Sequence, residues 1–438
     1  MLPSKTFRAV IVILGLLVSG SAGAQDDDAQ RRAMEEQLRQ LNEASREIDH
    51  VIREARESGN LLAELIALRD LEQSFEGKGP MAMQALKLRR MQGEVVLGNY
   101  AAAIELGDFG QGPLSSGGPA SGEVLSGFEG AAALDAIAEL AKDRKLVLIN
   151  EAHHQPQHRV FTLQLLAALR EAGFTHFAAE TLYESDEGLM KRGYPTEATG
   201  AYIPEPVYGD LVRQAIALGF QVVPYEAAFG NGPKAREDGQ AQNLIVRVFE
   251  KDPDARLIVH AGYAHIDESG TLAGVKTMAQ VLKERTGIDP LTIDQTLMSE
   301  HSRPTLEHPL YRYIADEMGI EQATVFLREE EPWTAQPGRR DVTVFHPRSA
   351  LESGRPTWLW MDGARKPFEV PAEAIGDAKR AILRARIQAE GEDAIPIDQV
   401  EIVKGQAFPA LMLPEGEHVI EVVGSDDEVI WTKTIAIE

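Results

Sequence analysis

The chain has 438 residues, too many for one ordinary hydrophobic core, so two or three domains are expected. Its hydrophobic content of 44% and charged content of 26% are typical of a globular protein. The formal net charge of −24 argues against nucleic acid and anionic lipid as partners, because both would repel the chain.

Residues 1–24 have the pattern of a secretory signal peptide. Lys5 and Arg8 precede an apolar run over 9–18, and small residues lead from there to Ala24. A membrane anchor needs about 20 apolar residues, and this run is shorter. We therefore expect cleavage near Ala24, no membrane anchor, and a periplasmic or secreted protein.

The sequence contains no cysteine, which limits the chemistry of any site. Disulfides, thiolate metal ligands and lipid attachment at a signal-peptide cysteine are all excluded. A bound metal would be held by histidine, carboxylate, amide or backbone oxygen, or water.

Residues 25–106 are predicted to form a helical subdomain. Apolar residues at alternating spacings of three and four predict a long helix over 29–57, and two more helices are expected at 61–71 and 81–96. The surface of this subdomain is a candidate site for a protein partner. Residues 107–130 are rich in Gly, Ser and Pro without periodicity, so we expect a linker there.

Residues 131–335 are predicted to form an α/β domain. Short apolar runs alternate with amphipathic helices up to about residue 300, which predicts βαβ units and a mainly parallel sheet flanked by helices. The expected strands are 146–149, 174–179, 220–223, 256–259 and 291–293. The expected helices include 158–172, 207–218, 235–250 and 274–285.

Residues 336–438 are predicted to form a β-rich C-terminal domain with no visible chemistry. A hairpin is expected on the turn Asp362-Gly363, between strands at 357–361 and 366–370. One further helix is expected at 371–388. The remaining strands are predicted at 342–345, 400–403, 410–413, 418–423 and 429–437.

An acid or an imidazole follows each apolar run of the predicted parallel sheet. In chain order these residues are Glu151 with His153 and His154, then Glu180, Glu226, His260 with His265, and Asp294. Ligands in such sheets bind at the carboxyl ends of the strands. We therefore expect these side chains to converge on one site.

The cluster after the first run carries the clearest chemistry. A carboxylate oriented against an imidazole can act as a base with its orienting group or as a pair of metal ligands. Two adjacent histidines cannot easily face one point, so either His153 or His154 faces the site. The structural alternative is a capping cluster that ends the strand. His158 and Arg159, on the first turn of the next helix, are expected to face solvent.

Arg236 opens a predicted helix, where a cation opposes the helix dipole. This placement suggests an anionic group in the cleft, and an ordinary surface arginine is the alternative. Glu180 closes an apolar strand and would be costly to bury unpaired, unless it is an exposed helix cap.

Two short motifs resemble the superfamily that unites Tiki proteases, ChaN-type haem-binding proteins and erythromycin esterases. Asn150-Glu151-Ala152-His153 resembles its Gly-Glu-x-His strand end, and Gly262-Tyr263-Ala264-His265 resembles its Gly-x-x-His motif. Glu180, and Arg236 with Asn243-Leu244, are supporting matches. The resemblance covers about residues 131–300. Asn150 stands where the family has Gly, which alters the turn.

The strand ends and the resemblance together predict a hydrolase, an esterase or a protease, acting on a small molecule or a peptide. Catalytic residues would be Glu151, His153, His154, Glu180 and His265. Arg236, His260 and Glu226 would bind ligand, and Glu151, His153 and His265 would hold a divalent metal such as Mn, Co or Zn. The alternative is a protein that binds haem or another small ligand without catalysis.

Overall fold

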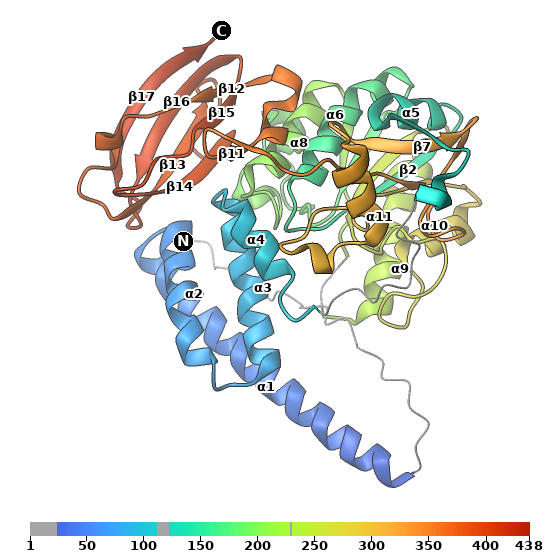
Figure 1. The fold of residues 1–438 in the computed structure, drawn as a ribbon, viewed down its shortest axis with the longest axis horizontal. Coiled ribbons are helices and arrows are strands. Elements are labelled where there is room, and N and C mark those ends of the chain that lie inside the picture. Colours follow the sequence, from blue (N-terminus) through green and yellow to red (C-terminus); the bar gives the residue numbers. More distant parts are fainter. Residues whose placement is uncertain (1–23, 112–121, 228–229) are drawn as a thin grey trace.

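The computed structural model describes residues 24–111, 122–227 and 230–438. Figure 1 shows a group of N-terminal helices, a central α/β domain and a C-terminal region of antiparallel strands. The α/β fold class is therefore confirmed. The predicted signal peptide lies outside the described residues except for Ala24. No helix of the described ranges is long and apolar enough to cross a membrane.

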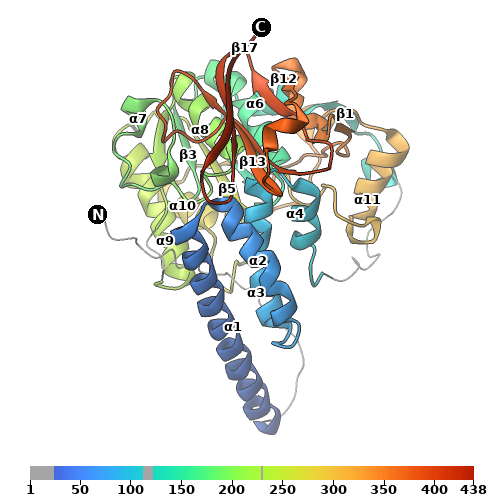
Figure 2. The same ribbon diagram turned by 90° about the vertical axis from the view of Figure 1, so that its left-hand side faces the viewer.

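The N-terminal helices are α1 (Ala24–Ser58), α2 (Leu61–Phe75), α3 (Pro80–Val96) and α4 (Tyr100–Gly107). Ala44, Ile48 and Ile52 of α1 are buried against α2 and α3, so the predicted stripe packs on neighbouring helices. Figure 2 shows that the first turns of α1 extend beyond the other helices. The linker predicted at 107–130 is described only at its ends, and its last residues begin β1 (Glu129–Ala132).

The central sheet contains six parallel strands in the order β4-β3-β5-β2-β6-β9. Every residue of β2 and β5 is buried, as expected when helices cover both faces of a parallel sheet. All five strands predicted from the apolar runs are present. The bounds are Leu146–Glu151 (β2), His176–Ala179 (β3), Gln221–Pro224 (β4), Leu257–Gly262 (β5), Leu291–Asp294 (β6) and Val342–Thr343 (β9).

Alternation along β2 divides the core into two layers. Val147 and Ile149 pack toward α5 (Ala133–Leu140), α6 (Gln157–Glu171) and α8 (Pro206–Ala217). Leu146 and Leu148 pack toward α9 (Pro233–Leu244) and α10 (Met278–Thr286) on the other face. The carboxyl ends of the strands, and the polar residues that follow them, therefore lie at one edge between two helical layers.

The C-terminal region contains a four-stranded antiparallel sheet in the order β14-β13-β16-β17. Its strands are Arg380–Ile387 (β13), Asp398–Val403 (β14), Gly416–Val423 (β16) and Val429–Ile437 (β17). The helix predicted at 371–388 is wrong, because a short 3₁₀ turn, Ala372–Ile375, is followed by β13. Ala381, Leu383 and Ala385 bury one face of that strand, so packing overrides the helix propensity of its Ala and Arg residues.

The predicted hairpin at 357–370 is also wrong. Thr357–Gly363 forms 3₁₀ turns with a kink at Met361 and Asp362, and β12 (Arg365–Phe368) pairs with β15 (Leu411–Pro414) instead. Leu359 and Met361 pack against α6 and α8, which explains why this segment does not pair as a strand. The strand predicted at 342–345 in the C-terminal domain contributes β9 to the central sheet, beside β6.

Candidate functional site at the carboxyl edge of the sheet

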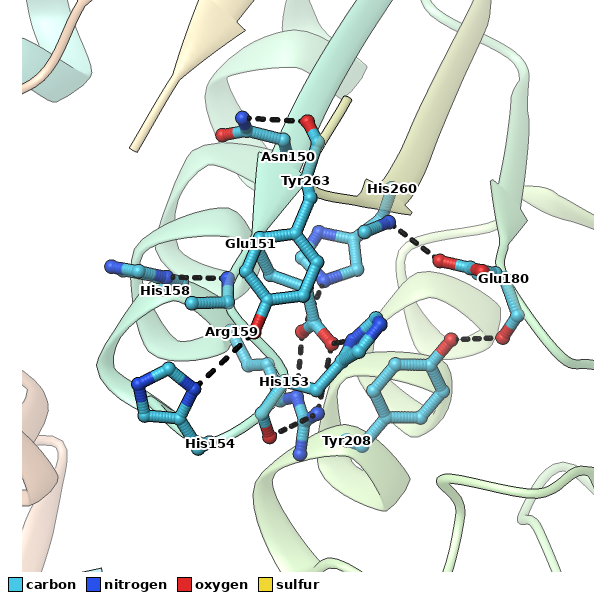
Figure 3. A network of polar contacts seen from close by, with 12 residues as sticks. Asn150, Glu151, His153, His154, His158, Arg159, Glu180, Tyr208, His260 and Tyr263 are labelled. Atoms are coloured by element: carbon cyan, nitrogen blue, oxygen red, sulfur yellow. Dashed lines mark hydrogen bonds and ion pairs between the residues drawn. The ribbon is translucent and has the colours of Figure 1, made fainter. Parts of the chain in front are cut away.

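Glu151, the last residue of β2, is the centre of a buried polar network (Figure 3). Its carboxylate accepts from Arg159 Nε at 2.7 Å and Nη2 at 2.8 Å. It also lies 2.7 Å from His153 Nδ1 and 2.8 Å from His260 Nε2. Burial would raise the pKa of Glu151, but Arg159 outweighs it and holds that pKa well below its usual range. Glu151 is therefore an ionised carboxylate whose oxygens are fully engaged.

Arg159 and His158 do not face solvent, contrary to expectation. Arg159 is 1% exposed and donates from Nη1 to Glu205 Oε2 at 2.9 Å. His158 is buried, and its Nδ1 accepts from the Ala152 amide at 3.0 Å. The first turn of α6 is buried because α8 and the 3₁₀ helix Thr357–Gly363 pack beside it.

His153 is the histidine that faces the network. Its ring centroid lies 4.6 Å from that of Tyr202 and 5.1 Å from that of Tyr263, and the side chain is 19% exposed. His154 turns away toward α4, where an added Cβ at Gly107 would lie 2.7 Å from its ring. Burial lowers the pKa of His154 to about 4, so this imidazole is neutral near pH 7.

Glu180 follows β3 and forms the second centre of the site. It accepts a hydrogen bond from the Gly262 amide and pairs with Arg236, and its Oε1 lies 3.6 Å from His265 Nε2. Burial alone would raise the pKa of Glu180, but His265 and Arg236 outweigh it and lower the pKa to about 2. Glu180 is thus a buried, ionised carboxylate and not an exposed cap.

Arg236 binds carboxylates of the chain itself. Its Nε lies 3.1 Å from Glu226 Oε1, its Nη2 lies 2.9 Å from Glu226 Oε2, and Nη2 also contacts Glu180. Nη1 lies 3.0 Å from His265 Nε2. The anionic group that its position suggested is therefore supplied by Glu180 and Glu226. The two supporting matches, Glu180 and Arg236, therefore lie in one cluster with His265 of the second motif.

His265 is oriented by a carboxylate, as His153 is. Its Nδ1 lies 2.8 Å from Glu237 Oε1, and Glu237 also caps α10 by accepting from the Met278 amide at 2.7 Å. Burial would lower the pKa of His265, but Glu180 and Glu237 outweigh it and raise that pKa. His153 and His265 are consequently both held at Nδ1 by a glutamate.

His260 and Asp294 are buried residues that contact other members of the site. His260 is fully buried within β5, between Glu151 and Thr162 Oγ1, which lies 3.1 Å from its Nδ1. Asp294 accepts from Asn150 Nδ2 at 3.0 Å and pairs with Arg340. His260 therefore acts through Glu151, and Asp294 acts through Asn150.

Gly262 allows the two centres to meet. A Cβ at this position would lie 2.4 Å from His153 Cε1 and 2.9 Å from Glu180 Oε2, closer than real side chains approach. Thr181, which follows Glu180, has a positive φ of 65°, and Tyr263, which follows Gly262, has a positive φ of 43°. Strained backbone of this kind is frequent at functional sites.

The predicted metal ligands Glu151, His153 and His265 do not present an open donor set. The carboxylate oxygens of Glu151 are engaged by three side chains, and both ring nitrogens of His265 have partners. Across residues 24–111, 122–227 and 230–438, no three His, Asp or Glu side chains are grouped as a metal site requires. A metal ion held by Glu151, His153 and His265 therefore stays a prediction from the sequence.

Sequence reasoning missed several members of the site. The sequence pattern places Arg159 in solvent, and it gives no role to Tyr263, although this residue lies inside the second motif. Tyr202, between β3 and α8, carries no local signal, because only the tertiary fold brings it to His153. Glu237 could have been identified from its position beside Arg236 at the start of α9.

The fold and the site define an α/β protein with paired Glu/His groups at the carboxyl edge of a parallel sheet. No protein-family model matches the chain, and no curated protein matches it. Among solved structures, the type III effector HopBA1 is 19% identical with a TM-score of 0.29, over 37% of this chain and 82% of its own.

Two toxin structures show a similar degree of likeness. One, described as bacterial protein toxins, is 16% identical with a TM-score of 0.30 over 54% of each chain. The other is RRSP, a MARTX toxin effector domain from Vibrio vulnificus CMCP6, 17% identical with a TM-score of 0.27 over 50% of this chain and 51% of its own. The chain therefore spans about half the length of these toxins, and the geometry of the site alone carries the functional argument.

Proposed function

We propose that the chain is an exported hydrolase in which His153 is the general base. The observation that carries this proposal is the 2.7 Å contact between His153 Nδ1 and Glu151 Oε1, in a histidine whose side chain is 19% exposed. An imidazole oriented at one nitrogen by an ionised carboxylate can remove a proton from water with the other. Arg159 keeps Glu151 ionised, so Glu151 can stabilise the imidazolium that forms.

His265 is the proposed general acid. Its Nδ1 is held by Glu237, and the carboxylates around it raise its pKa. To act as the acid, Nε2 would have to exchange its contact with Arg236 Nη1 for the leaving group, to which it would then donate the proton. Proton transfer in hydrolysis requires one group that accepts a proton and one that supplies it to the leaving group. The two oriented imidazoles, brought together through Glu180 and Gly262, meet this requirement.

Arg236 and Glu180 would set the charge of the site. Glu180 is ionised, with a pKa of about 2, and its charge is balanced by Arg236. The proposed roles of Glu226 and His260 are to position Arg236 and Glu151 respectively. In this assignment Glu226 and His260, which the sequence predicts to bind ligand, instead position the groups that react.

Turnover of esters and peptides tests the proposal. We expect hydrolysis by the purified mature protein, and we expect chelation by EDTA to leave the rate within about twofold, because side chains alone supply the base and the acid. A wild-type protein that hydrolyses no ester or peptide, with or without added Mn, Co or Zn, would sink the proposal. Activity that appears only with metal would instead support the metal-assisted form predicted from the sequence.

The export prediction belongs to the same proposal. Lys5, Arg8 and the apolar run that follows support a cleaved signal peptide ending near Ala24. N-terminal sequencing of protein recovered from its own cell envelope or medium tests this point. A mature chain that still begins at Met1 would contradict it.

A further inference from the structure

Tyr263, which packs beside His153, has a strained backbone conformation, several backbone hydrogen bonds and a partly exposed surface. Its φ of 43° is unfavourable for a residue with a bulky side chain, and yet the residue is 41% exposed. Strain of this kind persists only where surrounding contacts impose it. An ordinary surface tyrosine is not expected to adopt a strained backbone conformation.

Three hydrogen bonds impose the conformation. The Tyr263 amide donates to the Glu151 carbonyl at 2.9 Å. The Tyr263 carbonyl accepts from Asn150 Nδ2 at 3.0 Å and from Arg340 Nη2 at 3.2 Å. Tyr263 is thereby tied to the same strand end that carries Glu151.

The two donors to this carbonyl are themselves fixed. Asn150 is fully buried, and its Oδ1 accepts from the Gln295 amide at 2.7 Å. Arg340 is 7% exposed and pairs with Asp267 and Asp294, at 2.6 and 2.5 Å. A buried polar network in three strand ends therefore holds one tyrosine in place. This also accounts for an asparagine, with its donating side chain, at position 150.

The ring of Tyr263 forms one wall beside His153. It meets the imidazole edge-on at a centroid distance of 5.1 Å, and its hydroxyl lies 3.3 Å from His154 Nδ1 (Figure 3). Tyr202 packs near the same imidazole at 4.6 Å. Aromatic faces bind planar and apolar groups well. The exposed part of Tyr263 therefore offers such a surface next to the proposed base.

We propose that Tyr263 is a specificity-determining residue that packs against a planar apolar group of the substrate, beside the bond that is hydrolysed. Asn150 and Arg340 are its positioning residues. The inference rests on the proposed function for the identity of that bond. The contact between the ring and a planar group is a separate claim, so it can be tested by binding alone.

Two probes that differ by one planar group test the contact. Calorimetry compares the binding affinity of phenylacetamide with that of acetamide. Hydrolysis rates compare the phenylacetate ester with the acetate ester of the same alcohol. We expect wild type and Tyr263→Phe to prefer the phenyl compounds by about tenfold or more, the size of effect that an apolar contact provides. Tyr263→Asn keeps a residue that tolerates left-handed backbone but removes the ring, so it should lose the preference through KM. The exposed Val429, in β17 of the C-terminal sheet, supplies the control Val429→Asn, which should keep the preference.

Equal preference in wild type and Tyr263→Asn would overturn the inference. Asn150→Ala should lose the preference as Tyr263→Asn does, with its folded state checked by its unfolding temperature. If Asn150→Ala does not fold, the Tyr263 variants decide alone. If wild type hydrolyses no ester or peptide, the proposed function fails, while the amide titration still decides whether Tyr263 selects planar groups.

Discussion

Arg159 binds Glu151 through two parallel hydrogen bonds of 2.7 and 2.8 Å, although it belongs to the first turn of the helix that follows the strand of Glu151. Both residues are 1% exposed. The pair fixes the orientation of the carboxylate toward His153. It also joins the sheet edge to α8, because the same guanidinium binds Glu205, which accepts from two amides at the start of that helix.

Arg159→Met should strongly destabilise the protein. It would leave Glu151 and Glu205 buried without their cation, and breaking a buried pair in this way costs about 3–5 kcal/mol. The stability of Arg159→Lys should lie between those of wild type and Arg159→Met, since an ammonium keeps the charge but cannot form both hydrogen bonds to Glu151. Urea unfolding measures both. Arg39→Met is the control, because that arginine pairs only at the surface and should change the free energy of unfolding by less than about 0.5 kcal/mol. An Arg159→Met protein as stable as wild type would contradict the role given to this pair.

Gly262→Ala should reduce turnover with little effect on the fold outside the site. The new methyl group would meet His153 Cε1 at 2.4 Å and displace the proposed base, and a displacement of about 1 Å can cost around 100-fold in rate. Gly77→Ala is the matched control, since nothing lies within 4 Å of its added Cβ. Comparison of kcat for the two variants decides the point. Equal rates in both would show that the contact between His153 and Gly262 does not matter.

Stability should fall as the pH falls from about 6.5, the usual pKa of histidine. Burial lowers the pKa of His154 to about 4 and that of His346 to about 3, so the unfolded chain binds protons that the folded chain does not. Their contribution is therefore complete above about pH 6.5 and lost progressively toward pH 3. Glu180, with a folded pKa of about 2, adds a loss in the same direction below about pH 4.5.

Urea unfolding at a series of pH values measures this dependence. Each unit of pKa difference is worth about 1.4 kcal/mol, so the loss between neutral and mildly acidic pH should amount to several kcal/mol. His346→Gln removes one of the groups and should flatten the profile. A free energy of unfolding that stays constant from about pH 7 to pH 5 would contradict the assignment of neutral buried histidines.

The sheet and its polar edge followed from the sequence because the pattern is local. Each apolar run became a parallel strand, and Glu151, Glu180 and His265 meet because the carboxyl ends of parallel strands share one edge. The acids and imidazoles that follow these runs therefore come together at one edge of the sheet, as the pattern predicts.

The local sequence pattern does not predict which side chains are buried or which residues they contact. Arg159 is buried because α8 and residues 357–363, far along the chain, cover the first turn of α6. Tyr202 reaches His153 through the tertiary fold alone. In the C-terminal region, β13 has helix-forming residues but is held as a strand by pairing with β14 and β16 on both sides.

Replacing His153 and His154 one at a time shows which of the two histidines acts as the general base. On the best substrate from the ester and peptide panel, kcat/KM is measured for wild type, His153→Gln and His154→Gln, with folding checked for each variant. The account predicts a loss of at least about 100-fold for His153→Gln, the size expected for a general base, and a rate within about threefold of wild type for His154→Gln. Turnover retained by His153→Gln, or lost only in His154→Gln, would contradict it.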